Sequence, residues 1–346
     1  MYLKIKKLIE QEIRDYTRKM DRIYGLKRLS PLLFNNIREF ILREGKRVRP
    51  VLFCIGYLGF AKKIPSGLYR SAISLELLHD FMLVHDDIID KSQTRRGKPS
   101  MHAMLNLSLK TKKNLKFSGE DLTIVIGDVI YAMALDAFLA VKEMAIRKEL
   151  ALKKLISAAL YTGSGEFIEL LLGAKPIEKV TKKDVYKIYD YKTANYTFAS
   201  PLTMGAILAD ARKDNVEKLF DYGMCLGRAF QIKDDIIGTF GESSVIGKSN
   251  LTDLAEAKKT ILIWHAYNHT SRKNQNIIKR IFRKNLIGKI ELNQIRKLLL
   301  EAKSLQYAKN EIKTLEDNAK SILNSLAIKP NYRKALSEFS ERILKI

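Results

Sequence analysis

The chain contains 346 residues, 46% of them hydrophobic, which is enough for a sizeable core in one large domain or two ordinary ones. No run approaches the roughly 18 uninterrupted apolar residues of a membrane-spanning helix, and the N-terminal stretch lacks the apolar core and cleavage site of a signal peptide. We therefore expect a cytoplasmic protein without a transmembrane segment. Two cysteines, Cys54 and Cys225, exclude a disulfide framework and a CxxC metal site.

The charge balance is strongly basic, with 62 Lys and Arg against 38 Asp and Glu and a formal net charge of +24. Such an excess is typical of proteins that bind nucleic acid, an anionic membrane surface or a phosphorylated substrate. The lysines are scattered as on solvated helix faces, and the sequence has no zinc finger, aromatic RNA-binding motif or basic region with heptads. We expect no nucleic-acid partner, and a basic helical nucleic-acid-binding protein is the alternative from another class.

Helical periodicity runs through nearly the whole sequence, and its 7 prolines and 18 glycines form no linker. We expect breaks near residues 30–31, 62–67, 93–99, 110–121, 173–179 and 238–250, where turn-forming and helix-stopping residues gather. Residues 122–131 could pass for a strand, but their apolar continuation favours a buried helix, and residues 148–171 and 292–326 have helical spacing. Helix starts are expected at Thr181, three residues before Asp184, and at 249–252. The sequence predicts an all-α protein, a single large helical domain over residues 1–346, with the Lys-rich stretch 109–121 as a surface excursion.

Three acids stand together in VHDDIID, residues 84–90. On a helix Asp86 and Asp90 share a face one turn apart, with Asp87 beside them. Like charges repel at that spacing, more strongly beside an apolar wall, unless a cation neutralises them. Oxygen ligands suit Mg²⁺, which keeps several waters and is held by one or two carboxylates together with substrate phosphates. For this motif by itself, a solvated helix end is the simpler interpretation.

A second acidic pair, Asp234 and Asp235 in FQIKDD, also follows an apolar helical segment. Two acidic helix ends facing each other would hold several Mg²⁺ ions, which would bind a diphosphate. Basic clusters that suit a diphosphate accompany the acids: GKRVRP at 45–50, TRRGKP at 94–99 and YKTANYT at 191–197. Their joint presence favours a diphosphate site. His265 and His269 could share a metal, but no acid or thiol stands near them in the sequence.

In order and spacing these motifs resemble those of the trans-isoprenyl diphosphate synthases, the head-to-tail prenyltransferase family that includes farnesyl and geranylgeranyl diphosphate synthases. The matching stretches are GKRVRP, HDDIID…RRGKP, IGD (126–128), YKT (191–193), FQIKDD, GK…TDLAEAKKT (247–260) and YRKALSEFSERI (332–343). The resemblance implies an all-α isoprenoid-synthase-type bundle around a central cavity. It implies that isopentenyl diphosphate condenses with an allylic diphosphate, with several Mg²⁺ ions per active site, and that the protein forms a homodimer.

The resemblance also implies roles for single residues. Asp86, Asp90 and Asp234 would bind Mg²⁺, and Asp87 and Asp235 would support them or bind through water. The residues that resemble the allylic diphosphate site are Arg95, Lys192, Thr193, Gln231, Lys248 and Lys258. Those that resemble the isopentenyl diphosphate site are Lys46, Arg49, His79 and Arg96. The catalytic set is Asp86, Asp90, Arg95, Lys192 and Asp234, whose metal ions and charges would neutralise pyrophosphate as it leaves.

Product length is expected to depend on the residues before Asp86. A helix rises about 1.5 Å per residue, so Phe81 lies roughly 7–8 Å below Asp86 and Leu78 roughly 12 Å. A bulky ring there would stop the growing prenyl chain. An aromatic at Phe81 without a second at Met82 resembles archaeal geranylgeranyl diphosphate synthases. We therefore expect a C20 product, with a C15 or longer product, or a subunit that needs a partner, as alternatives.

The chain departs from the family pattern at a few positions. Gly238 stands where the family usually has a third aspartate, Glu166 and Glu169 replace the common GQxxD, and Ser249 replaces a proline. A terpene cyclase would share an aspartate-rich motif but would not need the isopentenyl diphosphate site. An inactive relative is disfavoured by the intact acids and cations.

Overall fold

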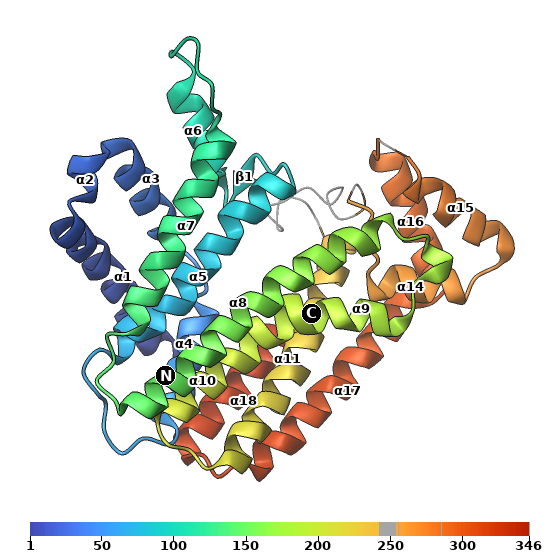
Figure 1. Cartoon of the computed structure of the whole chain (residues 1–346). Coiled ribbons are helices and arrows are strands. Elements are labelled where there is room, and N and C mark those ends of the chain that lie inside the picture. The colour runs from blue at the N-terminus through green and yellow to red at the C-terminus, as the bar shows by residue number, and fades with distance from the viewer. Residues whose placement is uncertain (242–253, 255, 285, 346) are drawn as a thin grey trace. The chain divides into compact units, whose positions relative to one another are not determined.

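The computed structural model describes residues 1–241, 254, 256–284 and 286–345. In that part of the chain nearly every regular element is a helix, which confirms the predicted all-α class (Figure 1). The exception is a short antiparallel hairpin of β1 (Thr94–Arg95) and β2 (Lys98–Pro99), which the sequence did not indicate. Two compact units are present: the first contains residues 1–155 and 204–211, and the second contains residues 156–203 and 212–346.

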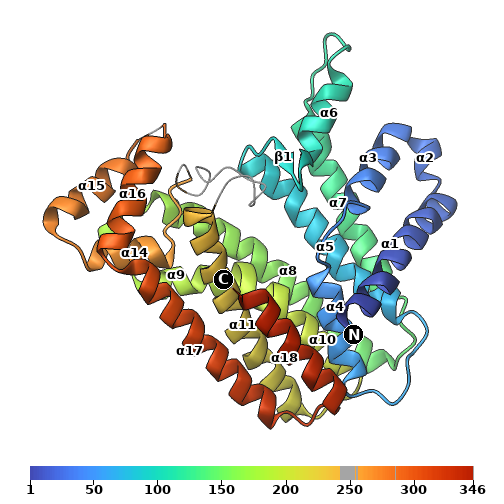
Figure 2. The same ribbon diagram turned by 180° about the vertical axis from the view of Figure 1, so that it is seen from behind.

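The first unit is organised around one helix that is buried on most sides, α5. Besides the hairpin, its elements are α1 (Tyr2–Tyr24), α2 (Leu26–Leu29), α3 (Pro31–Ile41), α4 (Val48–Leu58), α5 (Leu68–Ile89), α6 (Met101–Leu109), α7 (Gly119–Phe138), the first part of α8 (Ala145–Ala174) and the end of α10 (Ser200–Leu208). Helix α5 runs beside α7 and also packs on α4 and α1 (Figures 1 and 2). Leu75, Leu77 and Leu78 are all buried although they point in different directions, as expected of a helix surrounded by neighbours. The VHDDIID motif therefore lies at the C-terminal end of a core helix.

The second unit is built around α11 (Lys213–Phe240). Its other elements are η1 (Ile177–Lys179), α9 (Lys182–Ile188), η2 (Tyr189–Ala199), α14 (Ile261–Asn268), α15 (Arg272–Phe282), α16 (Lys289–Glu301), α17 (Ser304–Ser325), α18 (Pro330–Leu344), the end of α8 and the start of α10. Helix α11 packs on η2 and on α17. A Cβ on Gly227 would lie 2.2 Å from the Cα of Ala194, so this glycine permits the close approach of α11 to η2. Since η2 carries the YKT motif and α11 carries FQIKDD, this packing brings the two motifs together.

Most predicted helix boundaries are confirmed. Ser30 caps α3 through Leu33 N, and Thr181 and Asp184 form the predicted capping box of α9. The predicted start at 249–252 lies outside the described residues. The segment 292–326 is not continuous, because Lys303 adopts a left-handed conformation (φ 56°) and separates α16 from α17.

Helices α7 and α8 expose more apolar surface than the sequence suggested. The stretch 122–131 is helical as predicted, yet Ile124 and Val125 are exposed. Among the described helices α8 is the one that is long and apolar enough to cross a membrane by length and composition, and 28% of its most apolar window is buried. Helix α8 therefore leaves an apolar face exposed in the described structure.

Candidate active site

The acids of VHDDIID occupy two different environments at the end of α5. Asp86 and Asp90 are half-buried and one turn apart, with the amide of Asp90 bonded to the carbonyl of Asp86 at 2.8 Å. Asp87 is fully buried and accepts hydrogen bonds from the guanidinium of Arg95, with Nε at 2.7 Å. The structure therefore ties the predicted residue Arg95 to Asp87, while Asp86 and Asp90 stand together on the side open to solvent.

This donor set fits a hard divalent cation that retains most of its water. In the described part of the chain no three His, Cys, Asp or Glu side chains converge into a complete metal site. Mg²⁺ does not need such a cage, since one or two carboxylates with water and phosphate oxygens suffice. Asp86 and Asp90 have the chemistry and the one-turn spacing of such a partial site.

The four residues predicted for isopentenyl diphosphate all belong to the first unit. Lys46 is exposed and Arg49 is half-buried at the start of α4, His79 lies on α5, and Arg96 follows β1. Burial and the nearby arginines, Arg49 first among them, hold the pKa of His79 well below its ordinary value, so its imidazole is neutral.

Between Lys46 and Arg49 lies Arg47, a member of the basic cluster GKRVRP that had no predicted role of its own, and it is buried. Arg47 donates to Glu10 at 2.8 Å, to Glu76 at 2.6 Å and to the carbonyl of Arg43 at 2.6 Å. Its backbone is left-handed (φ 52°). These bonds fix the turn before α4, and with it the residues on either side.

Phe81 is half-buried on α5 and has an aromatic neighbour on α7. Its ring makes an edge contact with His85 at 4.8 Å and a tilted contact with Tyr131 at 5.1 Å between centroids. A Cβ on Gly127 would lie 2.5 Å from the His85 ring, so this glycine of the IGD motif makes room for it. Leu78 is buried and Met82 half-buried. The sequence did not indicate Tyr131 beside Phe81.

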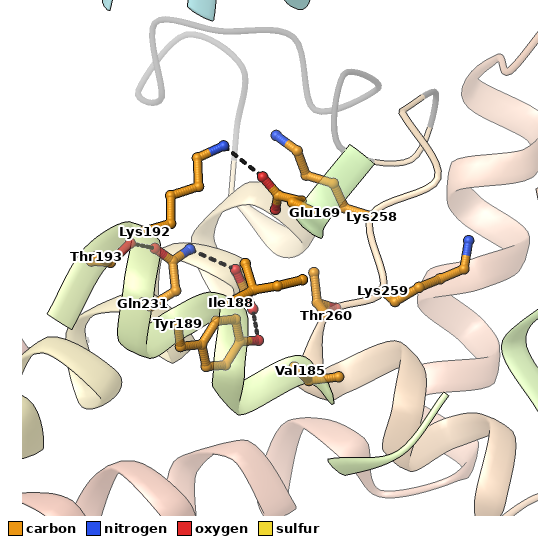
Figure 3. Close-up of a pocket in the computed structure, with 11 residues that line it drawn as sticks. Glu169, Val185, Ile188, Tyr189, Lys192, Thr193, Gln231, Lys258, Lys259 and Thr260 are labelled. Atoms are coloured by element: carbon orange, nitrogen blue, oxygen red, sulfur yellow. Dashed lines mark hydrogen bonds and ion pairs between the residues drawn. The ribbon is translucent and has the colours of Figure 1, made fainter. Parts of the chain in front are cut away.

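In the second unit a pocket of about 100 Å³ collects most of the predicted allylic-site residues (Figure 3). Its lining consists of Glu169, Val185, Ile188, Tyr189, Lys192, Thr193, Gln231, Asp235, Lys258, Lys259 and Thr260. Four predicted residues are brought together here, namely Lys192, Thr193, Gln231 and Lys258. Arg95 belongs to the first unit, and Lys248 lies outside the described residues.

Two glutamates of α8 hold the ammonium group of Lys192. Its Nζ lies 2.5 Å from Glu169 and also forms an ion pair with Glu166. Lys258 lies near Glu169 in Figure 3 and forms an ion pair with Glu256 at 2.7 Å. The glutamates that depart from the family's GQxxD pattern thus partly neutralise the pocket's cations.

A chain of hydrogen bonds forms the floor of the pocket. Thr193 donates to Gln231 at 2.6 Å, Gln231 donates to Asp235 at 3.0 Å, and Tyr189 donates to the other oxygen of Asp235 (Figure 3). The Tyr189 hydroxyl also accepts the amide of Ile261 at 2.9 Å. Tyr189 could not be recognised from the sequence, because a tyrosine near YKT is equally consistent with core packing.

The two aspartates of the second motif differ as those of the first motif do. Asp234 is exposed on α11, whereas Asp235 is buried among the donors described above. Gly238 lies one turn after Asp234 and supplies no third carboxylate.

Lys259, next to the predicted Lys258, also lines the pocket, although the sequence did not indicate it. It is buried, donates to the carbonyls of Gly173 and Ala257 at 2.9 and 2.7 Å, and burial lowers its pKa to about 8. Its role in the described structure is to fix the segment before α14.

In the described part of the chain, His265 and His269 form no metal site with acids or thiols. Their rings stack with centroids 4.1 Å apart, and each Nδ1 already has a protein partner, Ser304 for His265 and the carbonyl of His265 for His269. The structure favours packing as the role of this pair.

Comparison with known proteins agrees with these motifs. The chain matches the family model of the polyprenyl synthetases over residues 30–299. It is 28% identical to the short chain isoprenyl diphosphate synthase of Methanocaldococcus jannaschii, over 87% of this chain and 83% of that protein. It is 29% identical to the geranylgeranyl diphosphate synthase of Saccharolobus solfataricus, over 82% of this chain and 81% of that protein.

Solved structures share the fold. A geranylgeranyl pyrophosphate synthase from Corynebacterium glutamicum, complexed with isoprenyl diphosphate and magnesium, has a TM-score of 0.89 at 23% identity, covering 99% of this chain and 98% of that one. The geranylgeranyl pyrophosphate synthetase of Pyrococcus horikoshii has a TM-score of 0.82 at 24% identity, covering 100% of this chain and 98% of that one. These comparisons confirm the resemblance seen in the sequence motifs. The chain belongs to the polyprenyl synthetase family, as do the isoprenyl diphosphate synthases to which it is similar.

Proposed function

We propose that the protein condenses isopentenyl diphosphate with an allylic diphosphate, releases pyrophosphate, and gives geranylgeranyl diphosphate as its main product. The observation that carries this proposal is the end of α5, where Asp86 and Asp90 stand one turn apart above the ring of Phe81. A carboxylate pair followed down the same helix by an apolar, ring-lined wall suits a substrate with a diphosphate head and a hydrocarbon tail.

In this proposal Asp86, Asp90 and Asp234 hold Mg²⁺, and Arg95, Lys192, Lys248 and Lys258 bind the allylic diphosphate together with Thr193 and Gln231. Bound Mg²⁺ would supply charge neutralisation at the departing pyrophosphate. The protein's own cations provide the same kind of stabilisation, because fixed positive groups in a shielded site favour a developing negative charge. Lys46, Arg49, His79 and Arg96 bind isopentenyl diphosphate. We further propose that both units form one catalytic domain over residues 1–346.

Phe81 would set the product length. Its ring fills the space between α5 and α7 together with His85 and Tyr131. Replacing the ring with a methyl group opens that space, so a longer prenyl chain can pass.

We also propose a cytoplasmic homodimer that is joined through α8. Within the second unit Ile156, Leu160, Phe167 and Leu170 are exposed, and with Gly163 they follow the 4-3-4-3 spacing of a coiled-coil seam. At Gly163 no atom lies within 4 Å of where a Cβ would stand, which leaves room for a second helix. Glu166 and Glu169 on the same segment pair with Lys192, a polar arrangement that favours a protein partner over a lipid bilayer.

The test is a turnover assay with isopentenyl diphosphate, Mg²⁺ and a C5, C10 or C15 allylic diphosphate, after which the dephosphorylated products are sized by chromatography. We expect a C20 product that disappears with a chelator and falls on the order of 100-fold or more in Asp86→Ala. Phe81→Ala should give longer products at comparable turnover. Asp136→Asn, which removes an exposed acid of α7, is the matched control and should behave like the wild type. Absence of product with every starter would overturn the proposal, and a C20 product from Phe81→Ala would overturn the role of Phe81.

A further inference from the structure

A buried acid stands among the arginines of the first unit and has no role in the function proposed above. Asp80 lies on α5, one turn after Glu76 and next to His79, and its side chain has no exposed surface. Its Oδ1 lies 3.4 Å from Nη2 of Arg96. Its Oδ2 is buried and makes no hydrogen bond within the described part of the chain.

We propose that Asp80 is a positioning residue that holds Arg96 in the empty site and takes up a proton when a diphosphate binds to Arg96, so that isopentenyl diphosphate affinity is linked to pH. This inference rests on the proposed function, which assigns Arg96 to the isopentenyl diphosphate site. It adds a proton-linked carboxylate to that site.

The geometry supports this role because Arg96 is not fully committed to the protein. Its Nη2 makes long contacts of 3.4 Å with Asp80 and 3.6 Å with Glu76, and its Nη1 is buried without a hydrogen bond in the described structure. Arg47, in contrast, has short bonds to Glu10, Glu76 and a carbonyl. An incoming anion can therefore take over Arg96 at a lower cost than Arg47.

Charge counting around Asp80 gives the direction of the effect. The charged groups that face it are Glu76 on its own helix, Arg47 and Arg49 at the start of α4, and Arg96 after β1, while Glu10 of α1 reaches the cluster through Arg47. With Asp80 ionised, three guanidinium groups meet three carboxylates and the cluster is neutral. With Asp80 protonated the cluster carries one positive charge and attracts an anion. Neutral His79 adds no charge.

The two buried acids divide the proton between them. Burial and the neighbouring Glu76 raise the pKa of Asp80 to about 7, although Arg96 opposes this rise. Burial also acts to raise the pKa of Glu76, but Arg47, Arg96 and Arg49 together outweigh it, so the pKa of Glu76 is lowered instead. Asp80 is thus the member of the pair that changes charge near neutral pH.

A bound diphosphate brings further negative charge and draws Arg96 away, and both effects raise the pKa of Asp80 above its value in the empty site. By linkage, the affinity for isopentenyl diphosphate is highest below about pH 7 and falls as the pH rises above it. One linked proton corresponds to a Kd that rises up to about tenfold per pH unit.

Isothermal titration calorimetry of isopentenyl diphosphate, without Mg²⁺ or allylic substrate, tests the inference without turnover. Titrations between pH 6 and 8.5, in two buffers of different ionisation enthalpy, give both the Kd and the protons taken up. The wild type, Asp80→Asn and the control Asp136→Asn are compared. The ligand's own protonation contributes equally in all three, so any difference between them comes from the protein. In the wild type and in Asp136→Asn we expect more protons to be taken up on binding than the ligand itself takes up. In Asp80→Asn this excess should disappear, and the Kd should depend less steeply on pH.

Equal pH profiles for the wild type and Asp80→Asn would overturn the inference and leave the proposed function intact. If Asp80→Asn does not fold, the number of protons that the wild type takes up on binding still tests the inference. An uptake no greater than that expected from the ligand's own protonation overturns it. No binding by any variant would overturn both the inference and the proposed isopentenyl diphosphate site.

Discussion

Replacing Tyr189 with Phe removes one buried hydroxyl that joins three elements of the second unit. This hydroxyl on η2 donates to Asp235 of α11 and accepts the amide of Ile261, at the start of α14, at 2.9 Å. Burial and the Asp235 carboxylate raise the pKa of Tyr189 well above its ordinary value, so the hydroxyl stays protonated and remains a donor throughout the neutral range.

The expected loss of stability follows from the two hydrogen bonds that the Tyr189 hydroxyl makes. A hydrogen bond to a charged group contributes about 1.5–3 kcal/mol, and a buried amide left without an acceptor costs about 1–3 kcal/mol. Since the two losses share one atom and Gln231 still donates to Asp235, we expect Tyr189→Phe to lower the free energy of unfolding by roughly 3 kcal/mol. Tyr222→Phe in the same unit is the matched control. It loses one bond, to the carbonyl of Leu336 at 3.0 Å, and should cost about 1 kcal/mol.

Urea unfolding measures the difference as a shift in midpoint at unchanged m-value, and amide hydrogen exchange reports on the start of α14. Faster exchange there in Tyr189→Phe, with normal exchange in Tyr222→Phe, would place the loss at Ile261. The reasoning is refuted if Tyr189→Phe destabilises the protein no more than Tyr222→Phe does.

Two further predictions concern α8. Phe167→Glu places a charge in the exposed seam and should convert the proposed dimer into a monomer, as measured by light scattering. Leu107→Glu, at an exposed position of α6, should leave the dimer intact, and a wild-type monomer would contradict the proposed interface. Glu166→Gln removes one of the charges that neutralise Lys192, so the KM for the allylic diphosphate should fall roughly two- to fivefold, consistent with about 0.5–1 kcal/mol for a partly exposed pair. The control is Glu149→Gln, which breaks an exposed ion pair with Lys153 on the same helix. An increased KM in Glu166→Gln would contradict the prediction, because it would show that Glu166 supports substrate binding.

The sequence predicted the helical class and the motif positions well because both depend on local patterns. Apolar spacing identifies helices, and the structure confirms both the break predicted at residues 30–31 and the helix start predicted at Thr181. The break at Lys303 escaped prediction, since its neighbours keep the helical period and the reversal occurs in a residue type without turn preference. The hairpin at residues 94–99 was equally hidden, because strands of two residues have no measurable alternation.

The side chains that hold the site in place could not be predicted, because their roles depend on partners far away in the sequence. Arg47 meets Glu10 and Glu76, and Tyr189 meets Asp235 and Ile261. In the sequence such residues cannot be distinguished from a surface arginine and a core tyrosine.

The paired aspartates show most clearly what the structure adds to the motifs. Successive residues on a helix point about 100° apart, so the two acids of a pair have different surroundings. In the first pair Asp86 is half-buried while Asp87 is buried against Arg95, and in the second pair Asp234 is exposed while Asp235 is buried beneath Tyr189 and Gln231. In each pair the second acid is buried and bonded to side chains of its own unit, and the first is the more exposed of the two. We therefore expect the buried second acids to fix the orientation of the first acids, which are the ones proposed to hold Mg²⁺.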